Sequence, residues 1–371
     1  MFDRFGVWYR LTGDEAEARA KAEDLCLEQS VEYPASLVPE GFIRDHIVGH
    51  IERFEPDPNG GAYRVLVSFL NDSVGGELTQ LLNVLYGNIS LKKGFRLENL
   101  REGDSIWNTF KGPRFGRSGL RKILGQPKRP LLATAIKPMG LSSKALAEQA
   151  YKFACGGIDI IKDDHGLANQ PFAAFKERTE RCVEAVRKGS QKYGHPILFA
   201  PNITASYDDL MIRATFAKEK GAGALLVAPG LTGFDAMRTL ADDESIGLPI
   251  LSHPAFVGSF VTSPDNGISP YALFGQIMRL AGADASIYPH FGGRFGFSLD
   301  ECRGIADGSQ SPLGLSKSIF PAPGGGMKLQ RIPELREFYG DEVMFLVGGD
   351  LVKNGPDIEK NCEMFREMVE K

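Results

Sequence analysis

Eight short apolar runs alternate with helix-like or loop segments over the last two thirds of the chain, and this alternation restricts the fold more than any other feature. The runs cover residues 131–137, 158–162, 197–200, 224–228, 249–252, 285–288, 318–320 and 343–347. The segments most typical of helices are 142–154, 172–188, 208–220 and 357–370. Strands that alternate with helices build parallel sheets, and eight such units over about 240 residues match a (β/α)8 TIM barrel. We therefore predict an α/β fold with a C-terminal barrel.

The first 125 residues follow a different pattern. Their apolar runs and one helix-like segment fall at 7–11, 46–54, 63–69 and 76–85. This mixture indicates a small α+β domain of the ferredoxin-like kind. The stretch 112–126 is rich in Gly, Pro and Arg, which is typical of a connection. We expect an N-terminal α+β domain over residues 1–125 and a catalytic barrel over residues 126–371.

Composition excludes several classes of protein. Of the 371 residues, 43% are hydrophobic, which is enough for one large and one small domain. The net charge of −4 offers no basic field to nucleic acid. No apolar run reaches the length of about 18 residues that a membrane span needs, and the five cysteines lack CxxC spacing, which is typical of reduced thiols. We expect a cytoplasmic protein that binds neither nucleic acid nor a membrane.

The second apolar run of the barrel ends in Lys162-Asp163-Asp164-His165. Side chains alternate faces along a strand, so Lys162 and Asp164 point the same way, at the strand end where barrels place their chemistry. A lysine, a carboxylate and an imidazole can hold a hard cation only when the lysine is no longer a cation. A lysine carbamate, formed with CO2, would supply the missing carboxylate. The alternative is a buried Lys–Asp ion pair that only holds the barrel together.

Two glycine runs follow the last two strands of the predicted barrel. Gly324, Gly325 and Gly326 follow the seventh, and Gly348 and Gly349 follow the eighth. Loops at these two positions commonly bind a phosphate through backbone N–H groups, and glycine lets the backbone approach closely. Tight turns are the alternative. Two such runs on adjacent strands favour a phosphate site.

Four single residues complete the predicted barrel mouth. Lys137 ends the first strand and would bind a substrate oxygen or act as a base, unless it only packs its stem along the rim. His253 and His290 end the fifth and sixth strands and would bind sugar hydroxyls, unless they are satisfied core histidines. Arg294 lies in a glycine-rich loop that could fold over a ligand, and an ordinary surface arginine is the alternative.

Together these residues resemble ribulose-bisphosphate carboxylase (RuBisCO) and its non-carboxylating relatives, the type IV RuBisCO-like proteins. The stretch 156–165, followed by 169–172, resembles the metal-site signature of the family. The resemblance implies that Lys162 is carbamylated and that Asp164 binds Mg2+, with Mn2+ as a possible substitute. His165 stands where the family usually has glutamate as the third protein ligand.

The resemblance extends over nearly the whole chain. Tyr86-Gly87-Asn88 and Glu28 resemble segments of the N-terminal domain that reach the active site of a neighbouring subunit. It therefore implies a homodimer or an assembly of dimers. Four further stretches are most similar to the RuBisCO-like enolases of methionine salvage, namely 112–116, 129–132, 253–255 and 262–264.

Three departures from the family pattern argue against carboxylation. Met139 replaces a second lysine after the first strand, and the loop 291–298 contains no lysine to close over CO2. Pro254 replaces the arginine that grips a second phosphate. The resemblance then implies a substrate with a single phosphate.

The chemistry that the resemblance still implies is the formation of an enolate beside a cation-bound carbonyl. We expect an enzyme acting on a singly phosphorylated keto sugar or keto sugar acid, and we favour a lyase of carbohydrate catabolism, a 3-oxo-isoapionate-4-phosphate decarboxylase. The alternatives are a methionine-salvage 2,3-diketo-5-methylthiopentyl-1-phosphate enolase, a 5-methylthioribulose-1-phosphate isomerase, or a non-catalytic scaffold.

Overall fold

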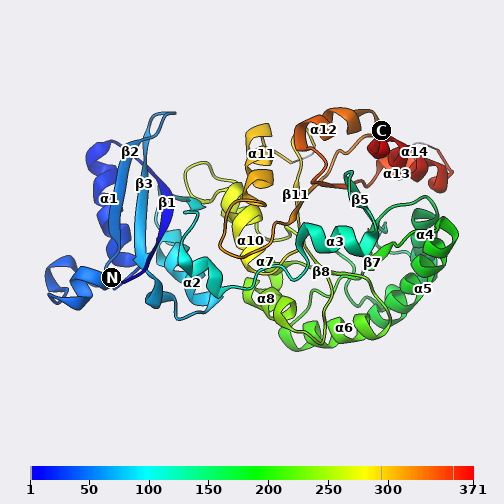
Figure 1. Cartoon of the computed structure of the whole chain (residues 1–371), viewed down its shortest axis with the longest axis horizontal. Coiled ribbons are helices and arrows are strands. Elements are labelled where there is room, and N and C mark those ends of the chain that lie inside the picture. Colours follow the sequence, from blue (N-terminus) through cyan, green and yellow to red (C-terminus); the bar gives the residue numbers. More distant parts are fainter. Residues whose placement is uncertain (1, 294, 354) are drawn as a thin grey trace.

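The computed structural model of the chain describes every residue except 1, 294 and 354. The chain forms a small sheet domain from its N-terminal part and a larger barrel from the remainder, placed end to end (Figure 1). The predicted combination of a TIM barrel with a small α+β domain is confirmed.

The N-terminal domain is built on an antiparallel sheet of four strands with two helices. Its elements are β1 (Arg4–Thr12), α1 (Glu15–Glu28), β2 (His50–Pro56), β3 (Ala62–Leu70), α2 (Leu78–Tyr86) and β4 (Phe95–Leu100). The strands lie in the order β4-β1-β3-β2. This βαββαβ succession is that of a ferredoxin-like fold.

The apolar pattern of the sequence does not predict helix α1. Its buried residues are Ala18, Ala22, Leu25 and Cys26, and so small a buried face hardly stands out among charged neighbours. The helix begins with a capping box, in which Asp14 accepts a hydrogen bond from the Glu17 N–H at 2.9 Å and Glu17 accepts one from the Asp14 N–H at 3.3 Å. The capping box is therefore the signal from which this helix could have been predicted.

Eight parallel strands form the barrel, one at each predicted apolar run, although the run 318–320 shares only Phe320 with the strand observed there. They are β5 (Leu131–Ala135), β6 (Ile160–Lys162), β7 (Leu198–Ala200), β8 (Leu225–Val227), β9 (Ile250–Ser252), β11 (Ala285–Pro289), β12 (Phe320–Gly324) and β13 (Met344–Leu346). Their order is β7-β6-β5-β13-β12-β11-β9-β8. A parallel bridge between Asn202 and Leu226 closes the sheet at the β7–β8 seam. All eight C-terminal strand ends therefore meet at one mouth.

Helices connect the strands around the barrel. The longer ones are α4 (Ser143–Cys155), α5 (Phe175–Tyr193), α6 (Tyr207–Glu219), α8 (Phe234–Asp242), α11 (Leu299–Gly308), α12 (Ile332–Tyr339) and α14 (Ile358–Glu370). The shorter ones are α7 (Pro229–Thr232), α9 (Gly258–Val261), a π-helix (Tyr271–Ile277) leading into α10 (Met278–Leu280), and α13 (Asp350–Lys353). Within the described ranges, no helix is both long and apolar enough to cross a membrane.

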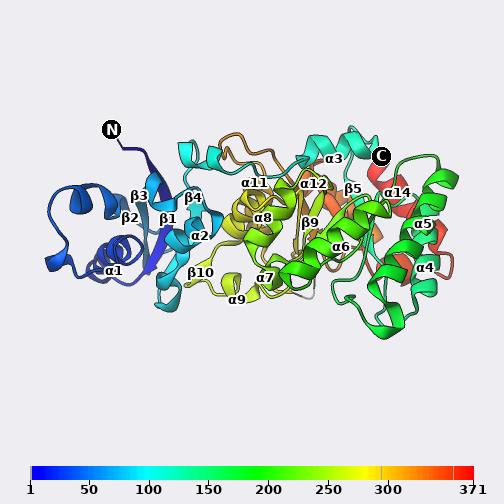
Figure 2. The same ribbon diagram turned by 90° about the horizontal axis from the view of Figure 1, so that it is seen from below.

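Two segments tie the domains together. Helix α3 (Gly116–Leu124) packs Leu120 and Leu124 into the same apolar cluster as the barrel-strand residues Leu131 and Ile160. Strand β10 (Gly267–Ile268) follows β9 and α9 in the chain but pairs with β4 of the N-terminal sheet (Figure 2). The loop after β9, which begins at His253, is therefore anchored in both domains.

Candidate active site

Lys162 is the last residue of β6 and is almost completely buried, with 2% of its surface exposed. Its Nζ donates a hydrogen bond to the backbone carbonyl of Asp163 at 3.1 Å. The pKa of Lys162 is lowered to about 8, chiefly by burial; the charge of Asp164 opposes this change and that of Lys137 adds to it. Among the described residues, no carboxylate lies within ion-pair distance of Nζ. The barrel-holding Lys162–Asp pair that the sequence left open is therefore not formed.

Asp164 pairs instead with Lys137, whose Nζ lies 2.9 Å from the Asp164 Oδ2. The other oxygen, Oδ1, accepts a hydrogen bond from the Gly166 N–H at 3.0 Å. Burial alone would raise the pKa of Asp164, but the hydrogen bonds from Lys137 and Gly166 outweigh it and lower the pKa. Asp164 is therefore a carboxylate at neutral pH and a suitable oxygen ligand.

Lys137 follows β5 and is half exposed. Its backbone N–H donates to the Gln149 side chain at 2.7 Å, and its carbonyl accepts from the same amide at 2.9 Å. Helix α4 thus holds the strand-end turn in place. The predicted position of Lys137 at the barrel rim is correct, whereas its ion pair with Asp164 was not predicted.

His165 and His253 stack on each other at this mouth. Their ring centroids lie 4.3 Å apart with an interplanar angle of 12°, and the His165 Nδ1 lies 3.5 Å from the Asp164 Oδ1. The Nδ1 of His253 accepts a hydrogen bond from the Ala255 N–H at 3.1 Å, so the proton of the neutral ring is on Nε2. Burial, followed by the charge of Lys162, lowers the pKa of His253 to about 2. His253 is thus a neutral hydrogen-bond donor.

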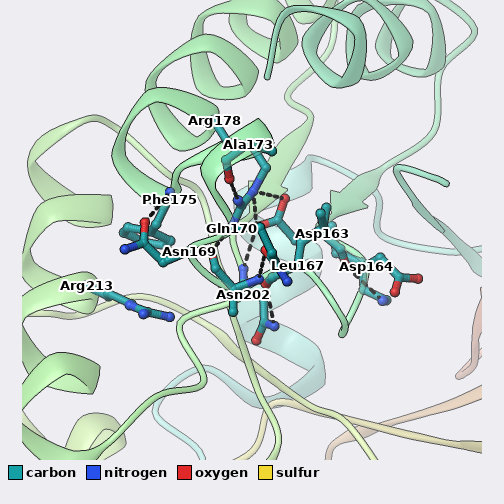
Figure 3. Close-up of polar contacts among 12 residues, drawn as sticks. Asp163, Asp164, Leu167, Asn169, Gln170, Ala173, Phe175, Arg178, Asn202 and Arg213 are labelled. Atoms are coloured by element: carbon teal, nitrogen blue, oxygen red, sulfur yellow. Dashed lines mark hydrogen bonds and ion pairs between the residues drawn. The ribbon is translucent and has the colours of Figure 1, made fainter. Parts of the chain in front are cut away.

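A second set of contacts holds the loop that follows β6 (Figure 3). Both carboxylate oxygens of buried Asp163 lie 3.2 Å from the Arg178 Nε, and one also accepts from the Asn202 N–H at 2.9 Å. Arg178, on α5, donates to the carbonyls of Ala168 and Ala173. The Asn202 amide donates to the carbonyl of His165 at 3.0 Å. These contacts fix the backbone that carries Asp164 and His165.

The sequence did not predict the role of Arg178. Burial raises the pKa of Asp163, and the neighbouring Arg178 opposes this. An arginine on an amphipathic helix has no local signature of such a contact. Its partner lies 15 positions earlier in the chain, on a different element.

The two glycine runs lie beside each other, since Gly324 at the end of β12 pairs with Leu346 of β13. Gly325 and Gly326 have φ values of +91° and +79°, which only glycine adopts readily. A Cβ on Gly326 would lie 3.0 Å from the Cα of Gly293, so the loop after β11 packs closely on this turn. Gly348 and Gly349 immediately precede α13. Phosphate binding at these glycines remains a prediction.

His290 follows β11 and is 1% exposed. Its Nδ1 lies 3.3 Å from the hydroxyl of Tyr339, on α12, while within the described part of the chain its Nε2 has no hydrogen-bond partner. Burial, and then the charge of Arg331, lowers the pKa of His290 to about 4, so the ring is neutral at neutral pH. An unpaired buried nitrogen favours a substrate contact. Tyr339 was not predicted, and Arg294 lies outside the described residues.

Glu28 ends α1 and Asn88 follows α2, both in the N-terminal domain, whose sheet lies at the opposite end of the molecule from α4 and α5 (Figure 1). The Asn88 amide donates to Glu28 at 3.1 Å, and the Lys92 Nζ lies 2.9 Å from the other Glu28 oxygen. These hydrogen bonds outweigh burial and lower the pKa of Glu28. Their predicted role in a neighbouring subunit's active site is neither supported nor contradicted by these contacts.

The donors at the mouth fit a divalent cation on one condition. Over the described ranges, no group of three His, Cys, Asp or Glu side chains is placed to hold a metal ion. Asp164 and His165 supply two donors, and Lys162 would supply the third as a carbamate. Carbamate formation needs a neutral amine, and burial moves Lys162 toward that form. The residues therefore fit a cation when Lys162 is carbamylated.

Comparison with known proteins shows the family to which the chain belongs. The family model for the ribulose bisphosphate carboxylase large chain, catalytic domain, matches residues 116–294. Ribulose bisphosphate carboxylase-like protein 1 of Rhodopseudomonas palustris is 38% identical over 365 residues, covering 98% of this chain and 97% of the relative. The 5-methylthioribulose-1-phosphate isomerase of Rhodospirillum rubrum is 34% identical over 354 residues, covering 95% and 92%.

A solved structure agrees with the sequence comparison. The crystal structure of a RuBisCO-like protein from Rhodopseudomonas palustris superposes with a TM-score of 0.90 at 34% identity, covering 100% of this chain and 98% of that one. The chain belongs to the RuBisCO large-chain family. Within the family it is a RuBisCO-like protein, as its motifs predicted.

Proposed function

We propose that the protein is an enolate-forming enzyme that acts on a keto sugar or keto sugar acid carrying one phosphate. The observation that carries this proposal is the convergence of Lys162, Asp164, Lys137, His165 and His253 at one barrel mouth. Three of these residues, Lys162, Asp164 and His253, have pKa values shifted from their ordinary ranges. Groups with shifted pKa values that gather at the C-terminal end of a barrel are typical of an active site.

Each residue at the mouth would have a different role in the reaction. The Nε2–H of His253 donates to a substrate oxygen, and the ammonium of Lys137, beside Asp164, stabilises developing negative charge. Carbamylated Lys162, Asp164 and His165 would hold a divalent cation, Mg2+ or Mn2+, which when bound supplies a Lewis acid for a carbonyl. The Nε2 of His290, which has no hydrogen-bond partner among the described residues, would donate to or accept from a substrate hydroxyl.

A single phosphate fits the two neighbouring glycine runs. Gly325 and Gly326, whose φ values are positive, would present backbone N–H groups to a phosphate, together with those of Gly348 and Gly349 on the neighbouring strand end. Pro254, two residues after the end of β9, offers no charge for a second phosphate. The substrate proposed is therefore a monophosphate.

Decarboxylation is the reaction that we favour at this mouth. Lys137 is engaged with Asp164, and the Nδ1 of His253 is occupied by a backbone N–H, so both groups donate protons or hydrogen bonds. Breaking the C–C bond to the carboxylate of a 3-oxo acid leaves its electron pair in the enolate, releases CO2 and needs no strong base. These features support a 3-oxo-isoapionate-4-phosphate decarboxylase.

The second candidate is an isomerase or enolase of methionine salvage. The relative from Rhodospirillum rubrum carries the name 5-methylthioribulose-1-phosphate isomerase, and one from Bacillus pumilus, 32% identical, is a 2,3-diketo-5-methylthiopentyl-1-phosphate enolase. Uncarbamylated Lys162, with its pKa near 8, would be a usable base for these reactions. The complete cluster argues against a non-catalytic scaffold.

Assembly forms part of the proposal. We propose a homodimer or an assembly of dimers in which Glu28 and Asn88 complete the barrel mouth of a neighbour. The solved RuBisCOs of Pyrococcus horikoshii and Hyperthermus butylicus are octameric and dimeric respectively, which supports an assembly.

A substrate panel tests the reaction. Purified protein with Mg2+ and bicarbonate should release CO2 from the phosphorylated 3-oxo acid faster than it converts either methylthio substrate. His165→Glu should tighten Mg2+ binding and slow decarboxylation, because an added negative charge makes the cation a weaker Lewis acid. His195→Glu, an exposed histidine on another part of the barrel, is the matched control. Turnover of a methylthio substrate with none of the keto acid would replace the decarboxylase by the isomerase or enolase.

A further inference from the structure

The His165 imidazole is the least expected donor at this mouth. It lies next to the Asp164 carboxylate, with 3.5 Å between Nδ1 and Oδ1, and is exposed. The carbonyl of the same residue is fixed by the Asn202 amide at 3.0 Å. Backbone and ring are thus both held in place beside an ionised carboxylate.

We propose that His165 makes this site select a first-row transition metal ion, such as Mn2+ or Co2+, over Mg2+. Imidazole nitrogen suits transition metals, whereas Mg2+ prefers oxygen ligands and octahedral water. The inference deepens the proposed function, because it concerns the cation of the same site and takes from that proposal the carbamate on Lys162.

The charge balance of the mouth points the same way. Mg2+ binding depends largely on negative charge at its ligands. Here the charge of Asp164 is shared with the Lys137 ammonium at 2.9 Å, and a neutral His165 adds none. Transition metals gain affinity from a bond to nitrogen that Mg2+ forms poorly, so the loss of charge penalises Mg2+ most.

His253 acts in this arrangement as a positioning residue. Its Nδ1 is occupied by the Ala255 N–H at 3.1 Å, and its ring lies flat against His165 at 4.3 Å. The nitrogen lone pair of an imidazole lies in the plane of its ring. Because the two rings are parallel and stacked, their lone pairs lie in two separate planes and do not converge on one ion. His253 therefore orients the His165 ring and does not bind the same metal ion.

Competitive metal binding tests the inference without any substrate. Untagged, metal-depleted protein is incubated with bicarbonate and equal concentrations of Mg2+ and Co2+, dialysed, and analysed for bound metal by mass spectrometry. The wild type should retain mainly Co2+. His165→Glu should move the Co2+/Mg2+ ratio toward Mg2+ by about tenfold or more, the scale on which ligand-shell changes act. His195→Glu should leave the ratio unchanged.

Pulsed EPR of the Mn2+-loaded protein identifies the ligand. A directly bound nitrogen should give 14N coupling in the wild type and in His253→Phe, which keeps a flat ring against His165. The coupling should be absent in His165→Glu and in His165→Ala, the second variant guarding against a folding defect in the first. Coupling that survives in both His165 variants, or an unchanged metal ratio in His165→Glu, would overturn the inference. Metal selection without turnover of any panel substrate would instead reject the proposed function alone.

Discussion

Two lysines, one in each domain, lie in opposite electrostatic surroundings. Lys92 in the N-terminal domain lies 2.8 Å from Asp24 and 2.9 Å from Glu28, and these contacts outweigh burial and raise its pKa above 10.5. Lys162 at the barrel mouth is buried beside a backbone carbonyl, and burial lowers its pKa to about 8. The ion pairs of Lys92 stabilise the folded N-terminal domain, whereas the barrel holds Lys162 where its positive charge is disfavoured. A chain keeps such a group where its chemistry is needed.

The largest expected effect comes from removing the disfavoured lysine. Lys162→Ala deletes the carbamate donor, so turnover should fall on the order of a thousandfold, a scale typical of a lost catalytic group. Wild-type activity should require a divalent cation and rise after preincubation with CO2, and the residual activity of the variant should respond to neither. Initial rates with and without EDTA and bicarbonate measure this, with Lys152→Ala, an exposed lysine on α4, as the control.

A wild-type rate that is unaffected by both EDTA and CO2 removal would show that the metal–carbamate arrangement is wrong. The difference between Lys92 and Lys162 would then affect only the stability of the protein and not its activity.

A smaller effect on activity is expected when two inactive variants, one altered in the N-terminal domain and one in the barrel, exchange subunits. Asn88→Ala and Lys162→Ala should each be nearly inactive as homodimers, because one damages the N-terminal contribution and the other the barrel mouth. After subunit exchange, random pairing should restore about one quarter of the wild-type sites, since half of the dimers carry one intact site of two. Activity is measured before and after mixing. Full activity of a verified monomer at high dilution would rule out the shared site.

The smallest expected effects are on the free energy of unfolding, whose pH dependence should differ between Lys162 and Lys92. In metal-free protein without added CO2, the Lys162 pKa is about 8 when folded and close to its ordinary 10.5 when unfolded. The unfolded chain then binds more protons between these values, so wild-type stability should rise with pH across this window, by ~3 kcal/mol at most. Lys162→Met should abolish the rise and be at least as stable as wild type near neutral pH.

Lys92→Met should behave in the opposite way. Its raised pKa means that the ion pairs stabilise the folded state fully below pH 10.5, and that this contribution is lost only as pH rises through the folded value. The variant should therefore lose about 0–1 kcal/mol near neutral pH, the range of partly exposed ion pairs. Urea unfolding of both variants from about pH 7 to about pH 10 measures the difference. Parallel pH profiles for the two variants would contradict the contrast.

The sequence by itself determined the barrel and the position of most candidate residues. Buried parallel strands are continuous apolar runs, and this local pattern predicted the barrel strands from β5 to β13, although the run 318–320 shares only Phe320 with β12, and it did not predict the two-residue β10. Lys137, His253 and His290 follow such runs, so their place at the mouth required no knowledge of distant contacts. Helix α1 was not predicted because its buried face is small and consists of two alanines, one leucine and one cysteine.

Tertiary structure alone decided which of these residues meet and what charge they carry. The stacking of His165 on His253, the ion pair of Lys137 with Asp164, and the contact of His290 with Tyr339 each join residues on different elements. No periodicity encodes these contacts, because they depend on how the loops leave neighbouring strands. The lowered pKa of Lys162 has the same origin, since desolvation arises only when the packed barrel excludes water from its side chain.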